Sequence, residues 1–342
     1  MSKKALRRVL VAGILVCGLL ASQAASAAED PNNPGLPDPS QYMCTRGACT
    51  QYAGVATVGF VGVERARQWA HVTAAGAAAL VGSVIYKRLS TLPAAEIELL
   101  RELGLDDYDV AHLENTNTKV IRWNNYVYAL SPEGSRNNFG DFPPTTVRTV
   151  AFGSIPAEVT IHISQLRDEE NLPVPLVATT FSSYYGTTGG ERLDSSRTFD
   201  TKVTGEVSVR LSDLIVDGVP VDLGTECKTV EPATLAGLRG KGFWDKGVGS
   251  APADELPTRE TWRTTPYYTA ALGGLLSGTI DIPAFTGCGV GGDDLSPLLT
   301  AMASGPGNQL SVRQSDIGRC FPANAPLPCV DDPLPLPDKW HE

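Results

Sequence analysis

The chain has 342 residues, with 28 Lys and Arg, 38 Asp and Glu, and a formal net charge of −10 at pH 7. This acidic balance excludes the electrostatic attraction to phosphates on which most binding to nucleic acids and anionic lipids depends. Hydrophobic residues make up 42% and charged residues 19% of the chain, as in an ordinary globular protein, and 34 Gly and 25 Pro residues predict many turns.

The first 27 residues predict a secretory signal peptide. A basic start is followed by the apolar run 9–21 and by the small-residue cleavage site at 25–27 (Ala-Ser-Ala). We therefore expect a secreted, extracellular or cell-envelope-associated protein. Cleavage would leave 24 basic and 38 acidic residues, a net charge of −14, because four basic and no acidic residues precede the site.

Two variants of export stay open at the N-terminus. Cys17 follows Val16, where a lipoprotein signal has a small residue, so ordinary cleavage is favoured over lipidation. Arg7 and Arg8 fit an ordinary basic start better than a twin-arginine signal, although the sequence does not separate the two routes.

Six cysteines follow the signal peptide, and an even number in an exported chain predicts disulfide bonds. Their spacing matches no zinc site. The alternative is that some of the thiols are free and buried. The simplest pairing joins sequence neighbours: Cys44 with Cys49, Cys227 with Cys288, and Cys320 with Cys329.

The chain divides into five segments by composition. They are the signal peptide 1–27, a Pro-rich linker 28–42, a mixed region with helices 43–145, a β-sandwich domain 146–320, and a Pro-rich tail 321–342. The tail is a flexible end or a motif for a partner.

Residues 60–105 are expected to be helical. The stretch 68–86 contains 19 residues without a formal charge, a length that could span a membrane. Its alanine, glycine and polar residues favour a packed helix of small residues over a membrane-associated or pore-forming segment. A second helix is predicted next, with Ser90 or Thr91 as its cap, Pro93 in its first turn and Gly104 at its end.

After residue 105 the pattern favours strands. Residues 120–130 are rich in aromatic and β-branched side chains, and apolar residues alternate with polar ones over 159–164, 203–211 and 276–282. Asp217-Gly218 predicts a two-residue hairpin turn. The expected fold is therefore mainly β, an antiparallel β-sandwich with a helical N-terminal region (α+β overall), whose sheets a Cys227–Cys288 bond could join.

The stretches 203–227 and 273–314 carry a resemblance. They are similar to a group of secreted actinobacterial proteins that have a signal peptide, a β-rich body and a Gly-Cys-Gly segment followed by Ser-Gly-Pro-Gly-Asn. The resemblance covers about residues 200–320 and implies an envelope or extracellular setting and a shared β-fold. It carries over no catalytic residues.

No motif predicts catalysis or a cofactor. The match of Gly287, Gly289 and Gly292 to a dinucleotide fingerprint is rejected, because a disulfide cysteine lies inside it, two carboxylates follow it, and no βαβ unit surrounds it. A Ser-His-Asp triad through His162 is conceivable, since the alternation places His162 on the polar face of its strand, but nothing positions a partner.

Clustered carboxylates could serve a glycosidase or bind calcium, but we expect them to be solvated loop charges, and we predict no metal site. The clusters are Asp106-Asp107-x-Asp109, Asp168-Glu169-Glu170, Asp293-Asp294 and Asp331-Asp332.

Aromatic residues near predicted strand ends give a binding hypothesis. Exposed rings can stack on the apolar faces of sugars, although core packing is the commoner use of such rings. The candidate residues are Tyr184, Tyr185, Trp262, Tyr267 and Tyr268.

We expect a non-catalytic secreted or envelope-associated protein that acts by binding or assembly, with an envelope glycan or protein as partner, no nucleic acid and no membrane insertion of the mature chain. One alternative is an extracellular hydrolase that acts on envelope polysaccharide through paired carboxylates. The other is a membrane-associated or pore-forming protein that uses residues 68–86.

Overall fold

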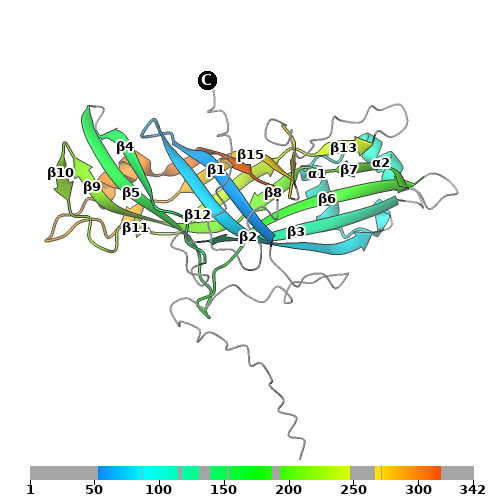
Figure 1. Ribbon diagram of the computed structural model, residues 1–342, viewed down its shortest axis with the longest axis horizontal. Helices are drawn as coiled ribbons and strands as arrows, with labels where there is room; N and C mark the ends of the chain where they lie inside the picture. The colour runs from blue at the N-terminus through cyan, green and yellow to red at the C-terminus, as the bar shows by residue number, and fades with distance from the viewer. Residues whose placement is uncertain are drawn as a thin grey trace, which may run out of the picture.

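Antiparallel strands make up most of the computed structural model (Figure 1). The structure describes residues 53–86, 88–114, 118–130, 139–151, 154–186, 193–246, 266–270 and 272–316. Within these ranges 17 strands join one continuous hydrogen-bonded sheet, so the predicted mainly β fold class is confirmed. The expected signal peptide and both Pro-rich segments lie outside the described residues, as do Cys44, Cys49, Cys320 and Cys329.

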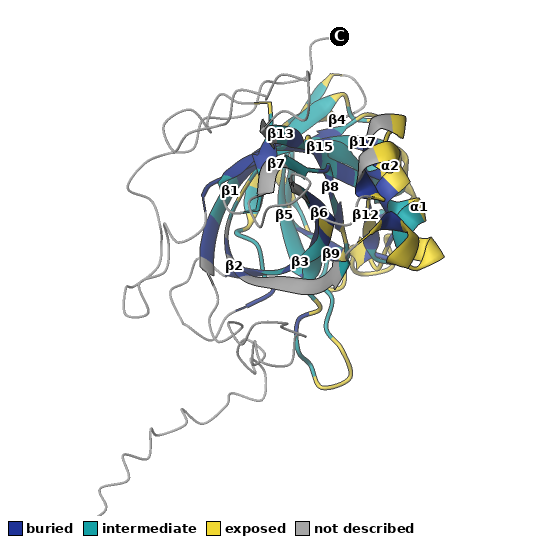
Figure 2. Ribbon diagram, turned by 90° about the vertical axis from the view of Figure 1, so that its right-hand side faces the viewer, coloured by how far each residue is buried: buried dark blue, intermediate teal, exposed yellow. Residues whose placement is uncertain are grey.

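Eight of the strands form a closed antiparallel ring, which Figure 2 shows from one end of the molecule. In their order around the ring they are β1 (Ala53–Val63), β2 (Gln68–Tyr86), β3 (Thr118–Leu130), β6 (Leu176–Gly186), β8 (Thr201–Thr204), β12 (Ala233–Gly240), β15 (Gly273–Ile282) and β17 (Gly305–Gln314). β17 pairs with β1 and closes the ring. The structure thus differs from the expected sandwich of two separate sheets, because β1 and β2 pair with strands that would otherwise be sheet edges.

The stretch 68–86 is the long strand β2, so the predicted helix there is wrong. Val72, Ala74 and Gly76 line the interior of the ring, whereas His71 and Thr73, which point to the other face, are exposed. Alanine favours helix, but propensity is weak compared with the backbone hydrogen bonds that β2 makes to β1 and β3. Because β2 carries small side chains on both faces, its sequence does not show the two-residue alternation that is typical of a strand.

The second predicted helix is confirmed as α1 (Ala94–Glu102), which is followed by α2 (Asp107–Leu113). The predicted cap is wrong, because Pro93 occupies the N-cap position. The Ser90 hydroxyl instead donates to Glu114 at 2.9 Å, and Thr91 lies in the short 3-10 turn η2 (Leu89–Thr91). Both helices pack on the outside of the ring through buried leucines, with Phe181 and Phe199 beneath them.

The sheet extends beyond the ring along three strands: β9 (Glu206–Val216), β5 (Ile155–Gln165) and β4 (Thr145–Ala151). They lie toward the end of the molecule that carries β10 (Val219–Val221), and α2 lies at the opposite end (Figure 1). Val207, Val209 and Leu211 are buried, as their alternation predicts. The predicted hairpin is also confirmed, since Asp217 and Gly218 have φ values of 50° and 77° between β9 and β10.

Three short strands complete the opposite end. β13 (Phe243–Lys246) pairs with β7 (Leu193–Thr198), which pairs with β6, while β14 (Tyr268–Thr269) pairs with β15.

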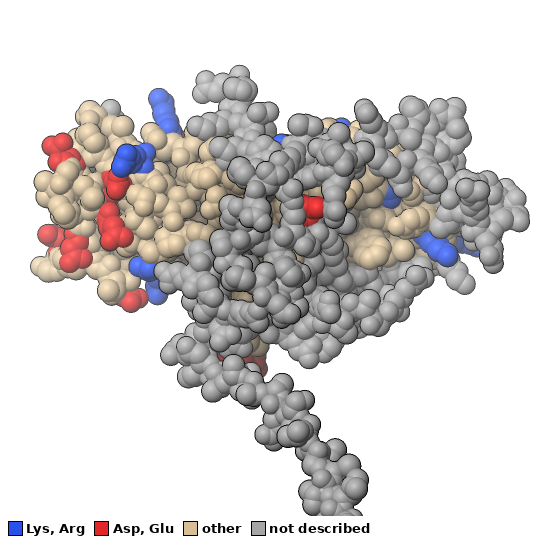
Figure 3. All heavy atoms as spheres, viewed as in Figure 1, with Lys and Arg blue, Asp and Glu red and all other residues tan. Residues whose placement is uncertain are grey.

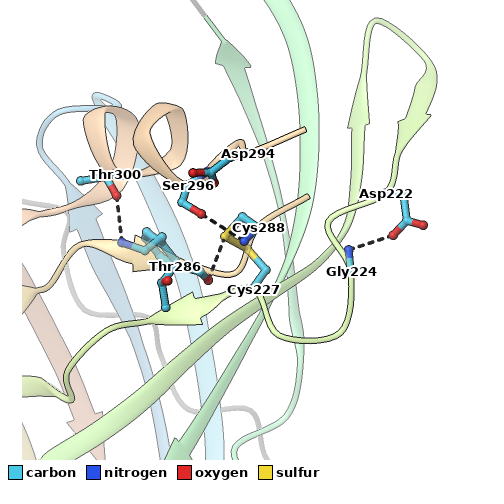
Figure 4. The surroundings of a disulfide bond; sticks show 9 residues. Asp222, Gly224, Cys227, Thr286, Cys288, Asp294, Ser296 and Thr300 are labelled. Carbon is cyan, nitrogen blue, oxygen red and sulfur yellow. Dashed lines mark hydrogen bonds between the residues drawn. A yellow bond between two sulfur atoms is a disulfide. The ribbon is translucent and has the colours of Figure 1, made fainter. Parts of the chain in front are cut away.

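The predicted bond between Cys227 and Cys288 is present (Figure 4). It links the residue before β11 (Lys228–Thr229) to the loop after β16 (Phe285–Thr286), and these two strands pair with one another in the one sheet. Helix α3 (Ser296–Ala303) supports this region, since the Ser296 hydroxyl accepts the Cys288 N–H at 3.1 Å. The Asp294 carboxylate accepts the Ser296 N–H at 2.9 Å near the start of the helix.

Replacing Cys227 and Cys288 together by alanine should lower the free energy of unfolding by about 4 kcal/mol, because the bond closes a loop of 61 residues in the unfolded chain. Urea unfolding followed by fluorescence measures this loss. Unchanged stability of the double variant would contradict the structural role of the bond.

Candidate functional site

The closed ring encloses a cavity of about 150 Å³, here called the central cavity. All eight ring strands contribute to its wall, which is almost entirely hydrocarbon. A ring of eight strands leaves an interior just wide enough for side chains or for one small ligand, so the size of the wall residues decides whether a space remains. Small and medium side chains leave the space here, among them Val72, Ala74, Ala178, Leu235, Leu276 and Val312.

The few polar groups in this wall are hydrogen-bonded within the protein. The Thr57 hydroxyl donates to the Ala74 carbonyl at 3.3 Å, and the Tyr268 hydroxyl donates to Gln314 Oε1 at 2.8 Å. The Gln314 amide nitrogen donates to the Ala270 carbonyl at 3.3 Å. Burial raises the pKa of Tyr268, whose hydroxyl is therefore neutral at pH 7. The central cavity presents hydrocarbon and few free polar atoms to an occupant.

A second cavity of about 120 Å³, here called the end cavity, lies between β4, β5, β9 and α3. Its wall includes Ala157, Ile161, Leu211, Leu299 and Met302. The Thr149 side chain also lies in this wall, and its buried hydroxyl has no hydrogen-bond partner. An occupant that reaches the hydroxyl would gain by carrying a hydrogen-bonding group there.

A serine, a histidine and an acid meet on the outer face of the sheet. His162 Nε2 lies 2.8 Å from the Ser212 hydroxyl, which donates its proton to Asp213 at 2.6 Å. The serine has only one proton to donate, so His162 Nε2 must donate to Ser212 and cannot serve as its base in this geometry. Burial and the charge of Arg210 lower the pKa of His162. None of the three residues lines either cavity, so the contact lacks the arrangement of a catalytic triad.

Two carboxylates of the Asp106-Asp107-x-Asp109 cluster, those of Asp106 and Asp109, hold α2 in place. Asp109 is fully buried and forms an ion pair with Arg197 of β7, which also reaches Asp106 at 3.3 Å. Each aspartate accepts the backbone N–H of the other, at 2.8 and 3.0 Å. Burial raises the pKa of Asp109, and the charge of Arg197 counteracts part of this rise. Asp106 and Asp109 share one arginine, and they do not face each other across a cleft as the two carboxylates of a glycosidase do.

Charged side chains of both signs are scattered over the face that Figure 3 shows, with acidic ones over the end that carries β9 and β10. Among the described residues, no three His, Cys, Asp or Glu side chains gather where they could hold a metal ion.

The predicted aromatic residues do not form one exposed groove in the described part of the chain. The Tyr184 side chain is half-buried on β6, and the Tyr267 ring lies 5.7 Å from that of Phe243. Tyr268 is only 2% exposed and lines the central cavity, so its ring is not a surface on which a sugar could stack. Trp262 and the side chain of Tyr185 lie outside the described residues.

No protein-family model, no curated protein and no solved structure matches this chain. Each helix that the structure describes is too short or too polar to cross a membrane.

The sequence patterns described above predict neither of the two cavities. The available signal was the row Val72, Ala74 and Gly76, which places small residues on alternate positions of one strand. Such a row can leave space in a core, but a neighbouring large side chain could equally fill it. The sequence does not show which neighbours it has.

Replacing Arg197 by alanine should lower the free energy of unfolding by about 3 kcal/mol at pH 7, because the buried Asp109 carboxylate would lose its cation. The pKa of Asp109 would then rise further, so the folded state would bind a proton more readily than the unfolded state. The loss should accordingly be smallest near pH 4 and increase as the pH rises.

Urea unfolding at several pH values measures this loss, with Arg101→Ala as the control. Arg101 also forms an ion pair, but its side chain is 64% exposed, so its removal should have little effect. Equal losses in the two variants would contradict the assigned role of Arg197.

Proposed function

We propose that this is an exported, non-catalytic binding protein that holds a small apolar molecule inside its closed ring. The observation that carries the proposal is the central cavity, whose wall comes from all eight ring strands and whose few polar groups are hydrogen-bonded to the protein itself.

The apolar wall of the central cavity determines which kind of ligand fits best. Water in such a space would find few hydrogen-bond partners, so an apolar cavity of this size stays dry and is available to an apolar guest. A guest with a polar group in the central cavity would leave that group unsatisfied, which costs about 1–3 kcal/mol. The preferred ligand is therefore neutral and apolar over the part that enters.

The rival functions receive less support from the described residues. A hydrolase needs a nucleophile or a carboxylate pair beside a substrate pocket, whereas Ser212 and Asp109 lie away from both cavities. A site that binds an envelope glycan by stacking needs exposed aromatic rings, whereas the ring of Tyr268 is buried. The Cys227–Cys288 bond is compatible with an oxidising extracellular setting, which the proposed export requires.

Benzene tests the proposal as a small neutral probe. It should raise the melting temperature of the protein, because it binds the folded state only. Phenol should bind roughly tenfold more weakly, because its hydroxyl would lack a partner in the central cavity.

The matched variants are Ala178→Leu and Thr73→Leu. Ala178 is 2% exposed and lines the cavity, so leucine should fill the space and abolish the effect of benzene. Thr73 is exposed on the outer face of β2, so its replacement should leave the effect unchanged. If benzene fails to stabilise the unaltered protein, or stabilises the Ala178 variant equally, the proposed function is wrong.

A further inference from the structure

The central and end cavities follow one another along the same strands. On β2, Gln68 and Ala70 line the end cavity, and Val72, Ala74 and Gly76 line the central cavity. These five residues occupy every second position of one strand, so they all point to one face of it. Their row passes from one cavity into the other without a change of face.

The same passage occurs on two further strands. On β1, Val63 lines the end cavity and Val61 the central cavity. On β5, Ile161 lines the end cavity and Ile163 the central cavity. The residues that border the two spaces are thus two positions apart, about 7 Å along a strand.

On strand β9 the bordering residues are four positions apart, and one side chain separates them. Val207 lines the central cavity, Leu211 lines the end cavity, and Val209 lies between them on the same buried face. All three belong to a single hydrophobic cluster, which also contains Leu299 of α3. The partition between the cavities is therefore about one layer of aliphatic side chains, which can change rotamers without breaking a hydrogen bond or moving a charge.

The combined space is long and narrow. From Gln68 to Gly76 the β2 wall spans eight residue steps, about 26 Å. Branched or multi-ring molecules of that length would have to displace the strands themselves, whereas an unbranched chain needs only the side chains of the partition to move.

We propose that the two cavities are one site for a single extended, unbranched alkyl chain. The inference rests on the proposed function and adds the shape of the ligand. The chain lies along β1, β2, β5 and β9, with one part in the central cavity and the remainder in the end cavity.

Unbranched alcohols of increasing length test this inference, with binding to the unaltered protein measured by calorimetry. Each added methylene should strengthen binding about fourfold as long as it enters an apolar wall. The gain should continue from n-hexanol to n-hexadecanol, because chains longer than the central cavity extend into the end cavity. A gain that stops once the central cavity is full would overturn the inference.

Two variants that fill only the end cavity supply the second measurement. Ala70 on β2 and Ala157 on β5 are 5% and 8% exposed and lie in its wall, so Ala70→Leu and Ala157→Leu should each weaken hexadecanol binding at least tenfold. Hexanol held in the central cavity should bind these variants as it binds Thr73→Leu, the outer-face control. Retained hexanol binding also shows that the variants fold.

The outcomes separate the two proposals. If both alcohols bind and neither variant weakens hexadecanol, the cavities are independent, so the inference fails while the proposed function stands. If neither alcohol binds the unaltered protein, the inference fails, and the benzene measurement decides the proposed function separately.

Discussion

The pairing of β1 with β17 is the contact on which the rest of the structure depends. Thr57–Val61 lie opposite Leu310–Gln314 in antiparallel register, and the Ser315 N–H donates to the Ala56 carbonyl at 2.8 Å. Gly59 permits this approach, because a Cβ there would collide with the Ser311 carbonyl oxygen. Without this pairing the sheet would have two free edges, and its apolar inner face would be open to water along the whole seam. Closure of the ring therefore surrounds the central cavity with strands on all sides.

The inside and outside of the ring have different chemistry as a result. Inside, the polar groups around the central cavity bond to one another, and the spaces are bounded by aliphatic side chains. Outside lie the ion pairs and the contact between His162 and Ser212. Among the described residues, the ion pairs and the His162–Ser212 contact thus lie outside the ring, and the wall of the central cavity is almost entirely hydrocarbon.

The elements that the sequence predicts well are those in which large and polar residues alternate. Val207, Val209 and Leu211 identify β9 because each apolar side chain has polar neighbours, and Asp217-Gly218 fixes a hairpin by local backbone conformation alone. The sequence does not predict β2 as a strand, because alanine and glycine occur on both its faces. The ion pair of Asp109 with Arg197 joins residues 88 positions apart, and the cavities depend on side chains from strands along the whole chain. Such features arise from the closed pairing, which no local pattern encodes.

A crystal structure determined under xenon pressure would show whether the central cavity accepts an apolar guest, because xenon enters apolar cavities without needing a hydrogen bond. We expect xenon density in the central cavity, in contact with Ala74, Ala178 and Leu276, with the ring strands unmoved. Ordered water in that space, or side chains collapsed into it so that no xenon enters, would contradict the claim that the ring encloses a site for an apolar ligand.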